Sequence, residues 1–436
     1  MEEWKDERME ERKNGRMKDE RSQIVTYPSQ PSTLQPSIRA AIARVIERGV
    51  FTPSVEVETF EQEFTAYLGV KHAVGVASGS AALLLALKAL GLGPGDEIIS
   101  TPQVDISVSA PISQAGVRQV WVDIHPRTYN LEPAELERKI TPRTRAIVAT
   151  HMYGNPVDME PLLPIARRHQ LPVVEDASLA LGATYRGQPV GTLGDVACFS
   201  FSPGKILSAC GKAGLVTTNN AALARHVRVL SSYGFKPDSL ATIERGVAGA
   251  QFEYEAEGFN ARLDELQAAV LRVKLPHLAE EVWKRRQYAA IYRDMLAELE
   301  PEHLLLPQAT PGSEPLYRIF VIRSPRRDEL LRHLAAAGLW AGLSYVPPLH
   351  LQPVYGYLGY RLGDFPQTEV VAQELQCLPT QTRTSPGRGG AHGGGDTEVF
   401  SVITSGTSTR SVKMSLRGRR ACPERSRRAK AIPTPE

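Results

Sequence analysis

The sequence predicts an α/β protein, with a large domain built on a mainly parallel seven-stranded sheet and a smaller α+β domain at the C-terminal side. Two observations lead to this prediction. Short segments rich in Val and Ile alternate with amphipathic helical segments, which is typical of parallel strands joined by helices. Near Leu266 this alternation gives way to a long helical pattern. The candidate strands are His72–Val76, Glu97–Ser100, Gln119–Ile124, Arg145–Thr150, Pro172–Glu175, Ala197–Phe201 and Leu215–Thr218.

Helical patterns separate several of these strands and continue into the smaller domain. Two lie in the large domain, at Ser80–Leu90 and Leu162–His169. A longer one covers Leu263–Glu298, and we expect a break at Pro276 because proline has no backbone N–H to donate. A strand at Tyr317–Ile322 and a helix at Arg326–Ala337 are expected to complete the smaller domain.

Amino-acid composition and apolar periodicity divide the chain into four segments. Residues 1–24 mix acidic and basic side chains without an apolar face, which predicts a disordered extension. Residues 25–265 should form the large domain and residues 266–381 the small one. Residues 382–436 are rich in Gly and Arg with little apolar periodicity, so we expect a disordered tail or a non-native reading of the gene's end.

Composition excludes several classes of protein. We find no apolar run of membrane-spanning length and no signal peptide among the 436 residues, so the chain is expected in the cytoplasm, away from membranes. The four cysteines are widely spaced, which argues against a disulfide framework or a zinc site. The formal net charge is +3, but residues 383–436 hold eleven Lys and Arg against four acids. This leaves about −4 for the rest (+3 less +7), so no nucleic-acid partner is expected.

An acidic residue followed by a lysine is the most informative pair. Asp176 ends the strand in PVVEDAS, and Lys205 lies downstream in FSFSPGK. An aldehyde cofactor needs a lysine amine for a Schiff base and a carboxylate that keeps its pyridine nitrogen protonated. The pair therefore predicts pyridoxal 5'-phosphate. Taken singly, Asp176 could merely cap the following segment, and Lys205 could be an ordinary surface lysine.

A candidate phosphate site follows the first strand. Gly79, Ser80 and Ala81 open a helical segment, and the first turn of a helix offers amide groups and the positive end of its dipole. The alternative is that Ser80 only caps the helix. The glycine-rich stretch Gly91–Glu97 follows a helix and precedes a strand, the reverse order from a dinucleotide-binding loop, so it predicts a turn.

The histidines give no support for a metal centre. The ten histidines show no HExxH or paired spacing, so we expect no catalytic metal. Individually, His151 and His350 are more readily structural residues than catalytic ones.

Several motifs together resemble a known enzyme family. They are SGSAALLLAL, VDIHPRTYNL, HMYGNPVDME, VVEDASLALGATYRG, GTLGDVACFSFSPGK, GFNARLDELQAAVL and YVPPLHLQPVYGYLGY. In this order and spacing they resemble the DegT/DnrJ/StrS sugar aminotransferases of the aspartate aminotransferase superfamily, over about residues 27–380. The resemblance implies a fold type I transferase that depends on pyridoxal phosphate and works as a homodimer with shared active sites.

The resemblance also implies roles for individual residues. Lys205 would form the Schiff base and then shuttle a proton, and Asp176 would pair with the pyridine nitrogen. Ser80, Ala81 and Ser200 would hold the phosphate, and Asn260 would reach the phosphate in the neighbouring subunit.

The implied reaction moves an amino group from an amino acid, commonly glutamate, to a keto group of a nucleotide-linked sugar. Such reactions serve amino-sugar, cell-surface polysaccharide or secondary-metabolite biosynthesis. Tyr345 and His350, in SYVPPLH, are the candidates for the substrate side. A dehydratase variant of the fold would carry histidine at the position of Lys205.

Three features differ from the family pattern. Leu179 stands where a Gln or His usually bonds the cofactor's phenolic oxygen, and Thr101–Ala115 lacks the usual stacking aromatic residue. The last helix of the small domain is not recognisable after CLPT. These differences keep a second hypothesis open, a degenerate homologue that acts as a non-catalytic regulator or scaffold.

Overall fold

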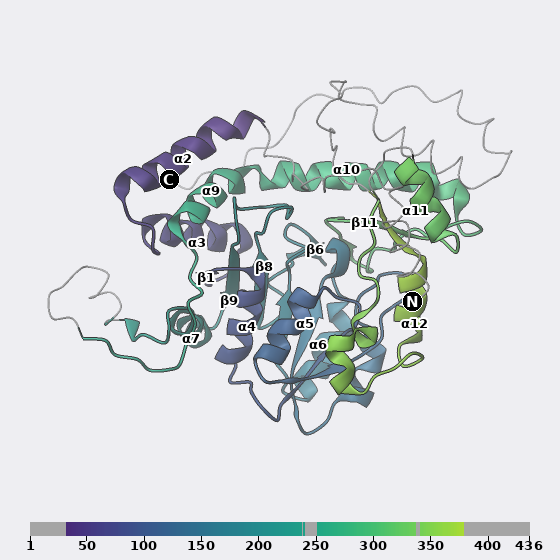
Figure 1. The fold of residues 1–436 in the computed structure, drawn as a ribbon, viewed down its shortest axis with the longest axis horizontal. Coiled ribbons are helices and arrows are strands. Elements are labelled where there is room, and N and C mark those ends of the chain that lie inside the picture. The colour runs from purple at the N-terminus through teal and green to yellow at the C-terminus, as the bar shows by residue number, and fades with distance from the viewer. Residues whose placement is uncertain (1–31, 238, 240–250, 337–340, 379–436) are drawn as a thin grey trace, which may run out of the picture.

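The computed structural model describes residues 32–237, 239, 251–336 and 341–378 (Figure 1). Among them, no helix combines the length and the apolar character needed to cross a membrane. The predictions made for residues 1–24 and 382–436, and for a last helix beyond CLPT, lie outside the described residues.

A seven-stranded sheet forms the centre of the protein, in the order β1-β9-β8-β5-β4-β2-β3. β9 runs antiparallel to both of its neighbours, and the remaining neighbouring strands are parallel. The prediction of a mainly parallel seven-stranded sheet is therefore confirmed, strand by strand, although β3 ends earlier than predicted. The bounds are β1 His72–Val76, β2 Glu97–Ser100, β3 Arg118–Trp121, β4 Thr144–Thr150, β5 Val173–Asp176, β8 Val196–Ser200 and β9 Gly214–Thr218.

Helices cover both faces of this sheet, because its strands bury apolar side chains on both sides. On one face α4 (Gly79–Ala89), α5 (Ile106–Gln114) and α7 (Ala221–Ser231) pack over alternate strand residues such as Val174 and Val216. On the other face lie α3 (Val55–Leu68), α6 (Met159–Arg168) and α9 (Glu265–Lys274). The preceding helix α2 (Gln35–Arg48) packs against α9. The predicted helices at 80–90 and 162–169 are confirmed as α4 and α6.

The C-terminal part contributes its own buried cluster. α10 (Leu278–Leu296) runs along one side of the molecule (Figure 1) and packs against β11 (Phe320–Arg323) and α11 (Arg327–Ala336). β11 pairs antiparallel with β12 (Leu375–Leu378), which follows α12 (Pro366–Glu374). The separate cluster supports a smaller domain here, while the boundary at residue 265 stays a prediction.

The predicted break at Pro276 is confirmed. α9 ends at Lys274, a 3-10 turn covers Leu275–His277, and α10 starts at Leu278. The remaining short elements are the strands β6 Thr184–Tyr185, β7 Gln188–Pro189 and β10 Ser313–Glu314, and the 3-10 helices Ser32–Leu34, Pro133–Glu135, Glu137–Lys139, Met152–Gly154, Ala297–Leu299, Leu349–Leu351 and Pro353–Leu358.

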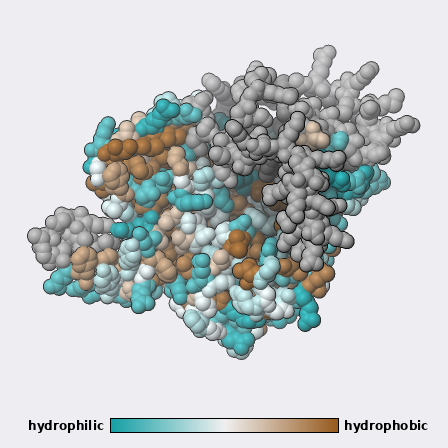
Figure 2. Space-filling model, in the orientation of Figure 1, coloured by the Kyte–Doolittle hydropathy of each residue, from teal (hydrophilic) through white to brown (hydrophobic). Residues whose placement is uncertain are grey.

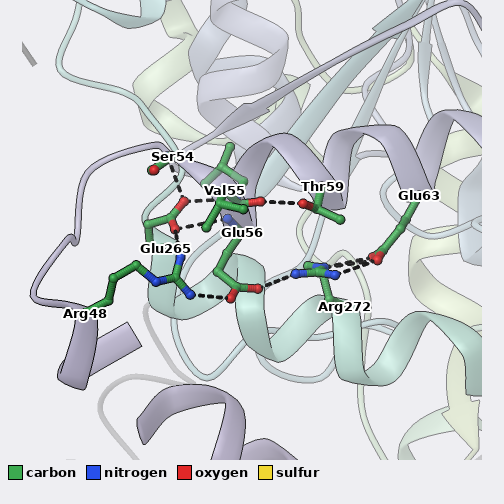
Figure 3. A network of polar contacts seen from close by, with 9 residues as sticks. Arg48, Ser54, Val55, Glu56, Thr59, Glu63, Glu265 and Arg272 are labelled. Atoms are coloured by element: carbon green, nitrogen blue, oxygen red, sulfur yellow. Dashed lines mark hydrogen bonds and ion pairs between the residues drawn. The ribbon is translucent and has the colours of Figure 1, made fainter. Parts of the chain in front are cut away.

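A buried carboxylate joins α9 to the N-terminal helices (Figure 3). The side chain of Glu265 is fully buried and accepts the backbone N–H groups of Ser54, Glu56 and Val57 at 2.8, 3.0 and 3.0 Å. These N–H groups lie at the start of α3, where a helix has no internal acceptors for them. Arg48 of α2 faces the same carboxylate at 3.6 Å. Glu265 therefore fixes three helices relative to one another.

We expect Glu265→Gln to lower the free energy of unfolding by about 2 kcal/mol or more, because an amide nitrogen would face buried N–H donors that lose their acceptor. Urea denaturation measures this loss. Glu63→Gln is the matched control, since Glu63 bonds Arg272 in the same network but is partly exposed. Equal losses in both variants would contradict the role given to Glu265.

Candidate active site

The candidate residues meet at one edge of the sheet. β1, β2, β4, β5 and β8 point in the same direction, so their carboxyl ends share an edge. Gly79 follows β1, Asp176 ends β5 and Lys205 follows β8. Ligands of open α/β sheets bind outside this edge. The topology thus brings together residues that are more than 120 positions apart in the chain.

Asp176 is held at the end of β5 and is buried, with 4% of the residue exposed. One carboxylate oxygen accepts hydrogen bonds from the backbone N–H and the hydroxyl of Ser178, at 3.1 and 2.5 Å. Strand neighbours alternate between the two faces, so Asp176 lies on the face covered by α4, beside Thr150 and Cys198. Glu175 points to the opposite face.

The start of α4, residues 78–81, packs closely against the end of β8. Ser78 caps the helix, its hydroxyl accepting the Ala81 N–H at 3.1 Å. The interpretation of Ser80 as the cap is therefore wrong, and its hydroxyl instead donates to the Ser107 carbonyl at 3.1 Å. Gly79 approaches Ser200 so closely that an added Cβ would lie 2.5 Å from the Ser200 Cβ. Only glycine fits there.

Lys205 lies on a tight turn after β8. Its N–H donates to the Ser202 carbonyl at 3.0 Å, and Gly204 adopts a φ of 89°, which favours glycine. Burial, followed by the positive charge of Arg318, lowers the pKa of the Lys205 amine to about 8, while the charges of Asp176 and Asp105 partly oppose this shift. A fraction of the amine is therefore neutral, hence nucleophilic, near neutral pH.

Two residues of the site were not predicted from the sequence. Asp105 follows β2 and caps α5, accepting the Ser107 N–H at 2.8 Å, and its charge acts on Lys205. Its place after a strand at the carboxyl edge was a signal that could have found it. Arg318 precedes β11, and its guanidinium donates to the Gly204 carbonyl. Nothing in its local sequence indicates that contact.

The other predicted residues are placed differently. Tyr345 lies within the electrostatic reach of Asp176, Asp105 and Arg318, so the structure brings it to the site. The side chain of His350 is fully buried, bonded to Glu369 at 3.0 Å and packed against Phe365, and thus lies in the core. Its role with substrate stays a prediction.

Asn260 is exposed, and its segment runs beside the end of β1, where the Ala77 N–H donates to the Ala261 carbonyl at 2.8 Å. Leu179 is half-buried, with its carbonyl packed against Gly154. The hydrophobic side chain of Leu179 offers no hydrogen bond to a phenolic oxygen. No group of three or more His, Cys, Asp or Glu side chains that could hold a metal ion occurs in the described parts of the chain.

These residues fit pyridoxal phosphate. A perturbed lysine, a carboxylate at a strand end and a helix start with serine hydroxyls are the donors that its aldehyde, pyridine nitrogen and phosphate require. Together with the seven-stranded sheet they define the fold type I class of pyridoxal phosphate enzymes. More narrowly, the chain belongs to the DegT/DnrJ/EryC1/StrS aminotransferase family, whose model matches residues 32–388.

Similar proteins agree with this membership. The chain is 42% identical to the dTDP-3-amino-3,4,6-trideoxy-alpha-D-glucose transaminase of Streptomyces venezuelae, over 78% of this chain and 86% of the relative. It is 39% identical to the pleiotropic regulatory protein of Geobacillus stearothermophilus, over 82% and 92%.

Solved structures extend the agreement to the fold. DesV of S. venezuelae, solved in complex with a ketimine intermediate, matches with a TM-score of 0.78 and 38% identity, over 86% of this chain and 96% of DesV. NtdA of Bacillus subtilis, solved with the cofactor PMP, matches with a TM-score of 0.73 and 27% identity, over 86% and 82%. The predicted fold class, family and sugar transamination are confirmed. The predicted cofactor is confirmed at the level of the family.

We expect Lys205 to react with an amine-acylating reagent with a midpoint near pH 8, in the cofactor-free full-length protein. Only the neutral amine reacts, so the rate should rise with pH through the lowered pKa and then level off. Mass spectrometry of the labelled peptides measures the rate. Lys236 is the internal control, because its contact with Glu253 raises its pKa and delays its labelling to higher pH. Identical profiles for both lysines would contradict the assignment.

Proposed function

We propose that the protein transfers an amino group from an amino acid, with glutamate as the expected donor, to a keto group of a nucleotide-linked sugar. The observation that carries this proposal is the placement of Lys205 and Asp176 together at the carboxyl edge of the sheet, near the start of α4, where the charge of Asp176 acts on the Lys205 amine. The name of the S. venezuelae relative supports a nucleotide-linked sugar as the substrate class. A cytoplasmic location stays a prediction.

The role of each residue follows from the part of the cofactor that it would contact. Pyridoxal phosphate supplies, when bound, an aldehyde carbon and an electron-withdrawing ring. The Lys205 amine would hold that aldehyde, and after release it would move the proton between the substrate carbon and the cofactor carbon. The Asp176 carboxylate, kept in place by Ser178, would keep the pyridine nitrogen protonated. Ser80, Ala81 and Ser200 would orient the phosphate at the helix start.

A regulatory role is the second candidate. It is favoured by the name of the G. stearothermophilus relative and by Leu179, which cannot supply the usual hydrogen bond. A regulator need not react with amino donors, whereas a transaminase must.

Spectra of the purified protein with pyridoxal phosphate test the proposal. We expect a visible band that disappears in Lys205→Ala and that glutamate shifts to the absorbance of the pyridoxamine form. We expect Asp176→Asn to retain cofactor but to lose about 100-fold or more of this half-reaction, because a neutral amide does not hold the ring nitrogen protonated. A band that is indifferent to amino donors would favour the regulatory role.

We further propose that the enzyme is a homodimer in which Asn260 serves the partner's site. Exposed aromatic side chains close to Asn260 support this proposal, because exposed apolar clusters mark interfaces. Tyr233, Phe252 and Tyr254 are 46%, 63% and 55% exposed, and the segments that carry them are bridged to each other and to Asn260.

Mixing two inactive variants tests the shared site. Lys205→Ala and Asn260→Asp, dissociated and reassembled together, should regain about a quarter of wild-type activity, since half the dimers are mixed and each has one intact site. The control mixture of Lys205→Ala with Asp176→Asn should regain none, because both residues serve the same subunit's site. Recovery in neither mixture would argue against an Asn260 contribution across the interface.

A further inference from the structure

Arg318 connects the C-terminal part of the chain to the turn that carries Lys205. The segment that carries Arg318 is held at two points, since the Leu316 N–H donates to the Gly154 carbonyl at 2.8 Å and Arg285 of α10 donates to the Arg318 carbonyl at 3.1 Å. From this position the guanidinium reaches the Gly204 carbonyl. Arg318 thus contacts the residue immediately before Lys205.

We propose that Arg318 is a positioning residue for Lys205, holding the turn that presents the amine and keeping a positive charge beside it. The inference rests on the proposed function, in which Lys205 carries the cofactor. In this role Arg318, which lies outside the sheet edge, helps to set both the position and the protonation state of the Lys205 amine.

The charges around the amine support this role. Arg318 and Lys212 oppose protonation of Lys205, while Asp176 and Asp105 favour it. Burial has the largest effect on the pKa of Lys205, and Arg318 has the next largest. Arg318 therefore offsets the two carboxylates, which alone would keep the amine protonated and unreactive.

A second arginine strengthens this electrostatic arrangement. Arg285 is 4% exposed, and burial, followed by the charge of Arg318, lowers its pKa to about 9. The two positive charges repel each other, while the hydrogen bond from Arg285 to the Arg318 carbonyl fixes the backbone from which the Arg318 side chain extends.

The test compares the pH profile of Lys205 acylation in the cofactor-free full chain of three variants. Removing the charge in Arg318→Gln should raise the pKa of Lys205, so the acylation rate at pH 7 should fall several-fold. The matched control is Arg286→Gln. Arg286 donates to the Pro315 and Gly182 carbonyls near the same segment, and its charge is not one of the main charges that shift the pKa of Lys205. Its profile should coincide with that of the wild type.

Arg318→Lys separates charge from geometry. It keeps the charge, so the acylation profile should stay near that of the wild type, but a single ammonium holds the turn less firmly and the first half-reaction with glutamate should slow. This variant also carries the test if Arg318→Gln does not fold. An unshifted profile in Arg318→Gln, an equal shift in Arg286→Gln, or a wild-type half-reaction rate in Arg318→Lys would overturn the proposal. A wild-type protein that does not react with glutamate would instead count against the proposed function, and the acylation profiles would still stand.

Discussion

A single buried carboxylate, that of Glu175, orders the region on which the site depends. Its oxygens accept the N–H groups of Gly191, Leu193 and Gly194 at 2.8, 2.7 and 2.7 Å. The ring of His151 lies 3.0 Å away. Since the Val157 N–H donates to the other ring nitrogen of His151, the nitrogen facing Glu175 carries the proton. Four hydrogen-bond donors thus compensate the cost of burying the Glu175 carboxylate. Glu175 therefore fixes the end of β5, and with it the position of the next residue, Asp176.

The same device recurs at Glu265, where a buried carboxylate collects backbone N–H groups that regular structure leaves without acceptors. Glu175 binds the N–H groups of a segment that connects two strands, and Glu265 binds those at the start of α3. Apolar packing fixes where the layers meet, and the two carboxylates fix how the connecting segments enter and leave them. Precise placement of Lys205 and Asp176 requires both, because apolar contacts are not directional while hydrogen bonds are.

The sequence was most informative where local pattern decides the outcome. The seven strands follow from short Val- and Ile-rich runs, and the break near residue 276 follows from the missing N–H of proline. Asp176 and Lys205 could be predicted because each ends or follows such a run. Arg318 and Asp105 could not be assigned, since their contacts depend on how distant segments pack. The cap at Ser78 was mistaken for Ser80, because helix starts inferred from sequence are uncertain by a residue or two.

The tight fit around the start of α4 has a consequence for biosynthesis. Gly79 touches Ser200 at the end of β8, and an added Cβ on Gly214 of β9 would lie 2.3 Å from the Ser78 carbonyl. Ser200 and Gly214, which pack against the start of α4, are therefore synthesised more than 120 positions after Ser78 and Gly79. A shorter nascent chain cannot complete this packing. Under the proposed function, pyridoxal phosphate can therefore bind only after the chain has been synthesised through β8 and β9, and its binding then stabilises the completed site.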